Sequence, residues 1–361
     1  MSRQMLLLSI IAVALVAGCR DASRSTAPLR VAEPAAVINA QGITATDISN
    51  GVDASVNGPR TISATGVILG RQGSQSTSLR GWWQAPAAAF SPIDDGFVQG
   101  GNRNADAGGG QGTAILSTNG GPPWTSVAVA SPAGVCATCT LVRDMNDSRM
   151  MVGNTLGSSI FALEWSSPTA IPVRLATPAT SFPPSQVIAQ SINNNGVIVG
   201  YVLETVPAKG KNTTSRYEAI VWVAGVPQIL PLAPGAATQV ASNINDAGTI
   251  SGFAGTALAR WTPRADGGYD VAVSTAALTN VSPYTGIDAC GRIVGGSDTG
   301  AWMWDGTTVV MLPTLTGAAG TARALDINDA GTIIGASTAG SSHGSPVFHS
   351  TIWTGLAPCV P

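Results

Sequence analysis

The stretch of sequence that decides the fold is I-N-D-A-G-T-I-I-G, residues Ile327–Gly335, because copies of it recur along the chain. Its middle residues are typical of a turn: Asn and Asp side chains bond their own backbone two residues on, and Gly takes the positive φ of a short hairpin loop. The residues on either side are β-branched and indicate paired strands. The copies begin at Ile62, Met145, Ile192, Ile244, Ile287 and Ile327, with a shortened copy at Ile93.

The spacing of the copies predicts the architecture. Successive copies start 31, 52, 47, 52, 43 and 40 residues apart, and a strand-based period of roughly 40–50 residues is the signature of propeller blades. A third strand follows, usually ending in Trp, as at Ala219–Trp222, and then an apolar fourth strand beside Pro, as at Gln228–Leu232. We therefore expect an all-β fold, a β-propeller of four-stranded antiparallel blades, with seven blades favoured.

The two ends of the chain predict how the ring closes. The last copy has a third strand at Ser350–Trp353 but no full fourth strand before Pro361, whereas Ala27–Pro34 resembles the fourth strand Ile171–Pro178. We therefore expect residues 27–34 to supply the outer strand of the final blade. A second interpretation stays open, because Ile38–Gly42 also fits the repeat and would add an eighth, degenerate blade.

The N-terminal sequence predicts export and a lipid anchor. A basic start precedes the apolar stretch Met5–Ala17, which is too short for a permanent membrane span. The small residues before Cys19 resemble the bacterial lipoprotein signal, which implies cleavage after residue 18 and lipidation of Cys19, so that several acyl chains anchor the protein. We interpret 1–18 as a signal peptide, 19–26 as the lipidated Cys and a flexible tether, and 27–361 as one propeller domain. The expected location is the outer membrane or the cell surface.

The composition argues against a nucleic-acid partner. Only 11% of the residues are charged and the formal net charge is −2, whereas a nucleic-acid-binding protein carries a basic patch. We expect a monomer that contacts the membrane through its lipid and binds an unknown protein or glycan. No cofactor or metal is predicted, because each repeat turn offers one acidic or amide group, where a calcium loop needs several. These groups are Asp147, Asn194, Asp246 and Asp329.

The four remaining cysteines predict two disulfides in an oxidising compartment. Cys136 and Cys139 lie between two blades, without the helix N-terminus of a redox motif or the further ligands of a zinc site, so a small local disulfide is expected. Cys290 lies in the first turn of one blade and Cys359 follows the third strand of the next. Strand directions put both on one face of the ring, where a disulfide would tie down the C-terminus.

Tryptophan is the residue type that suggests a sugar-binding platform. Six of the nine, however, recur at the end of the third strand, which predicts packing between blades. These are Trp83, Trp165, Trp222, Trp261, Trp304 and Trp353. Trp82, Trp124 and Trp302 fall outside that position and stay open as surface aromatics.

One repeat position offers candidate catalytic carboxylates. The residue before the repeat Ile or Met is expected to point toward the ring axis, and it holds Asp144, Ser191, Asn243, Gly286 and Asp326. Asp144 and Asp326 facing each other across a channel could act as a glycosidase or lyase pair. The alternative is that these side chains cap or bond strand ends, and the mixed occupancy favours it.

Insertions between the second and third strands are the candidate binding loops, because insertions on one face of a repeat protein commonly mark its binding face. They are Asn102–Gly112 with Asp106, Glu204–Tyr217 with Lys209, Lys211 and Arg216, and Ser337–Phe348 with His343. A basic loop on a weakly acidic protein could steer an anionic partner. Tolerated surface insertion is the alternative, as is a purely structural envelope protein.

The pattern A-x-x-I-N-x-x-G-x-x-x-G, followed by a strand ending in Trp and an apolar stretch with Leu and Pro, resembles the bacterial extracellular HAF repeat. The match is clearest at Ile192–Gly200, Ile244–Gly252 and Ile327–Gly335. The His-Ala-Phe that gives the family its name is absent: Glu218-Ala219-Ile220 stands in its place in one unit. The resemblance implies a secreted or surface-bound repeat protein and carries no catalytic residues across.

Overall fold

The computed structural model describes residues 36–360, apart from 39–41, 53–57, 73–78, 87–88, 94–97, 110–111, 118, 209–211, 275, 277, 279, 283, 318–319 and 343–344. By its contacts the chain divides into two units, Met1–Val31 and Ala32–Pro361, and the described residues belong to the second. The predictions for the signal peptide, Cys19, the tether and residues 27–34 lie outside the described residues. Within the described ranges, no helix combines the length and apolar character needed to cross a membrane.

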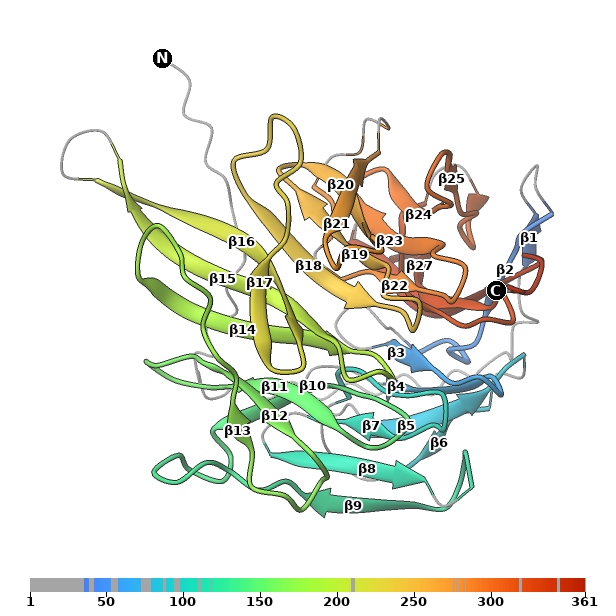
Figure 1. Cartoon of the computed structure of the whole chain (residues 1–361). Coiled ribbons are helices and arrows are strands. Elements are labelled where there is room, and N and C mark those ends of the chain that lie inside the picture. The colour runs from blue at the N-terminus through green and yellow to red at the C-terminus, as the bar shows by residue number, and fades with distance from the viewer. Residues whose placement is uncertain are drawn as a thin grey trace. The chain divides into compact units, whose positions relative to one another are not determined.

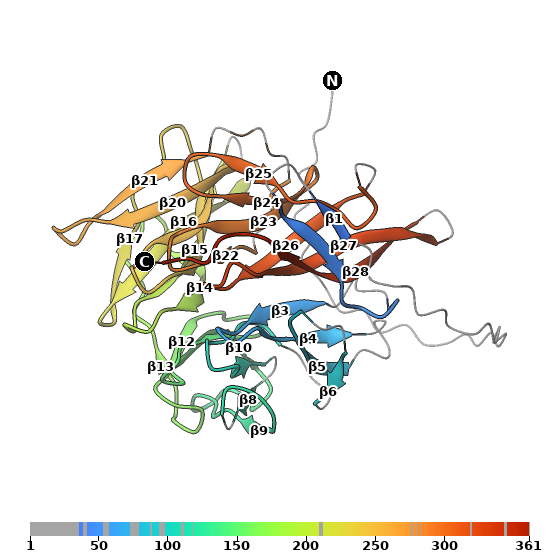
Figure 2. The same cartoon turned by 90° about the vertical axis from the view of Figure 1, so that its right-hand side faces the viewer.

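The described chain is a ring of seven antiparallel blades, which confirms the predicted propeller (Figure 1; Figure 2). The strands of blades one to three are β3 (Pro59–Ile62), β4 (Val67–Gln72), β5 (Leu79–Gln84) and β6 (Ser91–Pro92); β7 (Ala107–Gly108), β8 (Thr113–Ser117) and β9 (Trp124–Ala128); and β10 (Thr140–Met145), β11 (Met151–Thr155), β12 (Ala162–Trp165) and β13 (Val173–Arg174). The strands of blades four and five are β14 (Pro184–Ile192), β15 (Ile198–Pro207), β16 (Thr213–Val223) and β17 (Val226–Ile229), and β18 (Gln239–Ile244), β19 (Ile250–Ala254), β20 (Ala257–Pro263) and β21 (Tyr269–Val273).

Blades six and seven share one sheet. Their strands are β22 (Gly286–Ile287), β23 (Ile293–Ser297), β24 (Gly300–Trp304) and β25 (Val309–Met311), and β26 (Ala322–Ile327), β27 (Ile333–Ser342) and β28 (Ser345–Thr354), joined by β1 (Ala36–Ile38) and β2 (Thr44–Asp47). A single residue pair, Gly296 opposite Arg323, connects β23 to β26 and so links the two blades.

The repeat copy in blade two differs from the prediction. The expected copy at Ile93 is wrong, because the backbone N–H of Ile93 donates to Arg80 and continues the outer strand of blade one. The actual copy is Gly101–Gly109, in which Ala105 adopts the positive φ that Gly provides in most other blades. A Gly in place of the marker Ile hides this copy in the sequence.

An N-terminal strand closes the ring, as predicted, but it is not residues 27–34. β2 pairs antiparallel with β28 and occupies the outer position of blade seven, with Thr46 opposite Ile352. β1 pairs with the far side of β2, and Figure 2 shows this blue hairpin beside the red strands of blade seven. Ala45 points into the core and is fully buried. Ile38 belongs to β1, residues 39–41 lie outside the described residues, and the described residues form no eighth blade.

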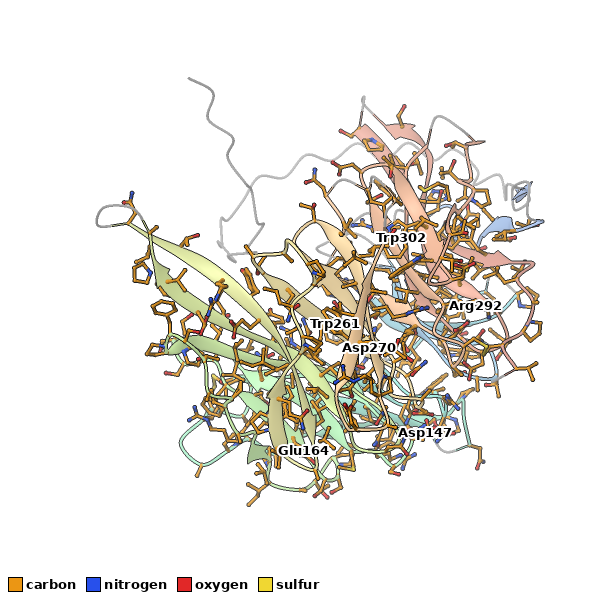
Figure 3. All side chains as sticks on the ribbon, turned by 45° about the horizontal axis from the view of Figure 1, so that its top comes forward. Asp147, Glu164, Trp261, Asp270, Arg292 and Trp302 are labelled. Atoms are coloured by element: carbon orange, nitrogen blue, oxygen red, sulfur yellow. A yellow bond between two sulfur atoms is a disulfide. The ribbon has the colours of Figure 1, made fainter. Side chains whose placement is uncertain are left out.

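The tryptophans at the third-strand ends pack between blades, as predicted. All six are at most 1% exposed. Four of the six also bond the segment leaving the preceding blade. The indole Nε1 of Trp222 donates to the carbonyl of Ala176 at 2.7 Å and that of Trp353 to Pro313, and Trp165 and Trp261 do the same. Trp302 is fully buried as well (Figure 3). Trp82 and Trp124 are half-buried and pack with ring centroids 5.3 Å apart.

The Asn of the repeat joins neighbouring blades. Its Oδ1 accepts backbone N–H groups of its own turn, as when Asn193 accepts from Val197 at 2.9 Å. Its Nδ2 donates to the backbone carbonyl of the equivalent residue in the next blade, as from Asn193 to Asn245 at 3.0 Å. The donors of this kind are Asn102, Asn146, Asn193, Asn245 and Asn328, each bonded at 2.9–3.1 Å. One side chain therefore folds the turn and attaches it to its neighbour.

Blade six has Asp288 at this position, which has no amide to donate, and other bonds hold it to blade seven. Both Asp288 oxygens accept from Arg292, whose Nη1 donates to the carbonyl of Ala357 at 2.8 Å. In the adjoining turn, Cys290 is joined to Cys359 in a disulfide. The C-terminal segment is thus attached at the junction that lacks the Asn bond. The second expected pair, Cys136 and Cys139, is also joined.

We expect the closing strand to control stability. A chain starting at Gly51 lacks β1 and β2, so it leaves one edge of β28 unpaired and removes the buried side chains of Ile43 and Ala45. It should melt at a much lower temperature than a chain starting at Ala36, which keeps both strands. Thermal unfolding followed by circular dichroism measures the difference. Equal melting temperatures would contradict the assignment of β2 as the closing strand.

Candidate functional site

The ring has two faces that differ in how much their loops vary. The turn between the first and second strands of each blade lies on one face, which we call the turn face. The connection between the second and third strands lies on the other, which we call the insert face. The turn-face loops are copies of one motif, whereas the insert-face hairpins of blades four and seven are long, with ten or eleven residues in each strand.

The acidic residues of the repeat turns bond the neighbouring blade rather than a ligand. The backbone N–H of Asn194 donates to Asp246 at 2.9 Å, and the N–H of Asp147 donates to Asn194 at 2.8 Å. The guanidinium of Arg103 reaches Asp246 at 3.0 Å and Asp329 at 3.4 Å, and so connects blade two to blades five and seven. One arginine therefore bridges two of the three repeat-turn aspartates, and the third, Asp147, accepts hydrogen bonds from Arg103 and Asn194.

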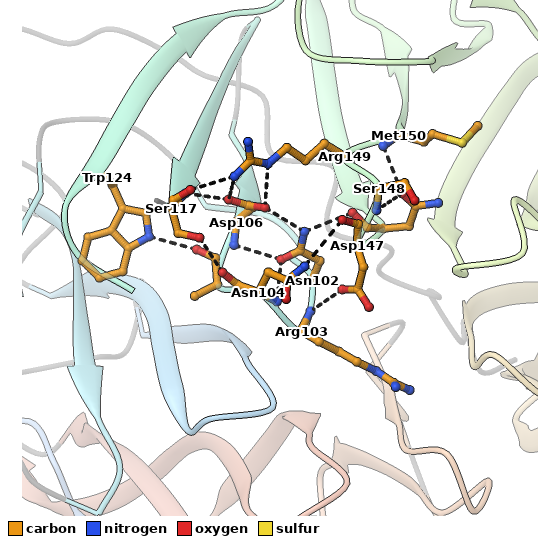
Figure 4. A network of polar contacts seen from close by, with 12 residues as sticks. Asn102, Arg103, Asn104, Asp106, Ser117, Trp124, Asp147, Ser148, Arg149 and Met150 are labelled. Atoms are coloured by element: carbon orange, nitrogen blue, oxygen red, sulfur yellow. Dashed lines mark hydrogen bonds and ion pairs between the residues drawn. The ribbon is translucent and has the colours of Figure 1, made fainter. Parts of the chain in front are cut away.

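Asp106 was predicted to lie in a binding loop, but the structure shows that it is a buried residue with a structural role. It is 1% exposed, and its carboxylate forms a two-point pair with Arg149 of blade three at 3.0 and 3.2 Å (Figure 4). Asn102 Nδ2 and the backbone N–H of Ser117 complete its hydrogen bonds. The expected insertion at Asn102–Gly112 is in fact the repeat turn and second strand of blade two. Its apparent length came from the misplaced copy at Ile93.

Asp144 and Asp326 are partly buried, and each is hydrogen-bonded to the next blade. Asp144 Oδ2 accepts from the hydroxyl of Ser191 at 2.7 Å and from the N–H of Ile192 at 3.1 Å. Asp326 Oδ2 accepts from the N–H of Ile62 at 3.0 Å. These bonds support the alternative interpretation of the two residues, in which their carboxyl groups bond strand ends instead of acting as a catalytic pair. Burial raises the pKa of Asp144 to about 7 and that of Asp326 to about 6, although these hydrogen bonds oppose the shift.

The first strands enclose a cavity of about 220 Å³ along the ring axis. In five blades the first strand carries a β-bulge two residues before the repeat Ile or Met. The bulge residues are Arg60, Arg143, Gln190, Ser242 and Leu325. All five line the cavity, as do Gln99 and Thr285 at the same position of blades two and six. Bulges re-aim side chains, so this position, which we call the bulge ring, presents seven side chains to the axis.

The last Gly of the repeat makes room for the bulge. A Cβ at Gly153 would lie 1.9 Å from the carbonyl oxygen of Leu141, and one at Gly252 would lie 1.9 Å from that of Val240. Both glycines pair with the residue just before the bulge. No other residue tolerates this approach, so the motif requires Gly there. The sequence analysis did not use this signal, and it missed the bulge ring.

Basic and phenolic groups gather in the cavity. Arg143 donates from Nε to Asn154 Oδ1 at 2.7 Å, and burial lowers the pKa of both Arg143 and Arg60. Tyr284, whose side chain is exposed, lines the same cavity. Among the described residues, no carboxylate forms an ion pair with Arg60 or Arg143.

The blade-four hairpin, β15 and β16, projects from the ring on a rigid base (Figure 1). Glu204 is fully buried and pairs with Arg216 at 2.5 Å, and Arg216 also contacts Glu218 at 2.9 Å. The rings of Tyr201 and Tyr217 pack edge-on at 5.6 Å. Arg216, expected as a free cation in a binding loop, is therefore part of the base.

Three further residues were expected in the binding loops of blades four and seven. Lys209, Lys211 and His343 lie outside the described residues. In blade seven, His349 Nδ1 and Asp47 of the closing strand lie 2.6 Å apart, and Arg323 lies over the ring of Phe348. Within the described ranges, no three His, Cys, Asp or Glu side chains group as metal ligands.

Comparison with known proteins assigns no family. No protein-family model matches the chain, and no curated protein matches it. A proposed gluconolactonase shares 10% identity over 89% of this chain and 96% of its own, with a TM-score of 0.42. The extracellular domain of a proposed one-component system from B. thetaiotaomicron shares 9% identity over 90% of this chain and 47% of its own, with a TM-score of 0.45. A gluconolactonase from Xanthomonas campestris shares 9% identity over 75% of this chain and 94% of its own, with a TM-score of 0.37. At such scores the propeller assignment rests on the strand pairing, and no activity is carried over.

We expect stability to fall as pH rises from about 4 to about 7, with Asp144 as one cause. A carboxyl whose pKa is higher in the folded than in the unfolded state opposes folding when it ionises, so its contribution is lost as pH rises through the folded value. The variant Asp144→Asn should show a smaller fall in melting temperature between pH 5 and pH 8. The exposed control Asp266→Asn should keep the wild-type slope. Identical slopes in wild type and Asp144→Asn would contradict the raised pKa.

Proposed function

We propose that the protein is an extracytoplasmic binding module, held to the outer membrane by lipidated Cys19, that binds a partner protein through its insert face. The observation that carries this proposal is the open edge of the blade-four hairpin. The turn face, by contrast, has its polar groups committed to bonds between blades.

The hairpin offers unpaired strand edges at a fixed position. β14 reaches only to Glu204 of β15, and β17 pairs with β16 only over Ile220–Val223. Beyond these points β15 and β16 pair with each other as far as Pro207 opposite Thr213, without another strand among the described residues. The exposed residues Thr213–Ser215 lie on this edge. An exposed strand edge binds an extended segment of another protein by adding a strand.

The anchor expected from the sequence and the disulfides both support the proposed location. Two disulfides are typical of a compartment outside the cytoplasm. We expect Cys19→Ser to abolish labelling by radioactive palmitate and to move the protein from the membrane fraction to the soluble fraction. Unchanged labelling and fractionation would contradict the anchor without bearing on the insert face.

The hairpin is tested by shortening it. Replacing residues 205–215 by Asn-Gly joins Glu204 to Arg216, which face each other across the hairpin, through a two-residue turn that suits this geometry. We expect an unchanged melting temperature, because the Glu204–Arg216 base remains. A photo-cross-linking residue at Thr214 of the full-length hairpin should give a protein adduct in intact cells, and untagged shortened protein should not compete with it.

Two controls accompany this test. The same cross-linker at Thr307, exposed in the outer hairpin of blade six, should give no adduct. The double variant Asp144→Asn and Asp326→Asn should bind as the wild type does, whereas a hydrolase or lyase would lose its activity. A Thr214 adduct that shortened protein displaces as well as wild type does would refute the role of the hairpin.

A further inference from the structure

The bulge ring differs from the rest of the repeat in that its side chains vary. The seven positions hold two Arg, two Gln, Ser, Thr and Leu, although the bulge or its equivalent places each of them against the same cavity. Because the fold accepts Gln, Ser or Leu here, blade geometry does not require Arg. The two arginines of the ring therefore need another explanation.

Their surroundings do not neutralise them. Arg60 and Arg143 have no ion pair among the described residues. Five carboxylates also line the cavity. Asp144 and Asp326 direct hydrogen-bonded oxygens to Ser191 and to Ile62 of the next blade. The other three, Asp147, Asp246 and Asp329, belong to the repeat turns, where Arg103 pairs with two of them. Both guanidinium groups are partly buried and line the cavity, and a guanidinium forms its strongest hydrogen bonds with an anion, so the cavity favours an anion beside them. Arg143 is also held in place through its bond to Asn154.

We propose that the axial cavity binds a small ligand that bears an oxoanion, a carboxylate or a phosphate, between Arg60 and Arg143. Guanidinium groups bind both anions through two parallel N–H bonds. Tyr284 of blade six also lines the cavity, and Gln99 and Gln190 add amide groups there. These neutral groups suit ligand hydroxyls, as in a sugar acid or a sugar phosphate. The cavity, about 220 Å³, limits the ligand to a small molecule.

This site rests on the proposed role as a binding module, but it uses none of the hairpin residues. It is tested by titration calorimetry at low ionic strength with inorganic phosphate, D-glucuronate and D-glucose. We expect saturable one-to-one binding of phosphate or glucuronate and none of glucose, and the anion bound more tightly identifies the ligand group. Arg60→Gln and Arg143→Gln should each weaken that binding at least tenfold, and the double variant should abolish it.

Matched variants separate binding from folding. Gln occupies the same position in blades two and four, so the fold tolerates it, and melting temperatures check this directly. Arg174→Gln makes the same change of charge at an exposed site in the outer strand of blade three and should bind as wild type. Arg143→Lys keeps the charge without the two-point geometry and should have intermediate affinity. Absence of saturable anion binding by the wild type, or wild-type affinity in the double variant, would overturn the proposal, and the shortened hairpin should leave anion binding unchanged.

Discussion

The ring depends on one side-chain amide, that of the repeat Asn. A propeller blade is a small sheet that cannot hold its place alone, so its stability comes from contact with its neighbours. The amide of Asn193 closes its own turn through oxygen and bonds the next blade through nitrogen. Five such bonds at about 1 kcal/mol each are comparable with the net stability of roughly 5–15 kcal/mol that folded proteins have. An ionised Asp has no donor for the second bond, and the shorter Ser63 closes its turn while a backbone bond makes the link to the next blade. This is consistent with Asn at five of the seven repeat positions.

The two blades that lack this Asn show how the constraint is met otherwise. In blade one, Ser63 closes the turn with its hydroxyl, and the link to blade two is a backbone bond from Ala64 to Arg103. In blade six, Asp288 and Arg292 bond the C-terminal segment, which the Cys290–Cys359 disulfide also ties to that blade. A covalent link thus lies near the junction where the amide donor is missing. From the sequence, the disulfide was expected only to tie down the C-terminus. In the structure it also holds the blade in which Asp288 replaces the repeat Asn.

The sequence predicted what repeats, and it failed where a copy departs from the pattern. The period, the seven blades, the buried third-strand tryptophans and the strand-bonding interpretation of Asp144 follow from residues that recur. Blade two was misplaced because Gly101 replaces the marker Ile, and that error turned the buried Asp106 into a surface residue. The closing strand was misassigned because resemblance between short apolar stretches cannot choose among them. The choice depends on pairing with β28, a contact nearly the whole length of the chain away.

The bulge ring could have been found from the sequence by a different argument. Gly inside a strand commonly marks a bulge, and the final Gly of the repeat recurs in the second strand opposite the residue that precedes the bulge. The recurring Gly of the repeat therefore makes room for the bulge, and the bulge residue, which faces the cavity, differs from blade to blade. Asp144 and Asp326, one position along, are committed to the neighbouring blade and cannot serve as such variable groups. With the proposed anion site, ring assembly and ligand binding fall on adjacent residues of the same strand, so a substitution in the bulge ring can change binding without removing a bond between blades.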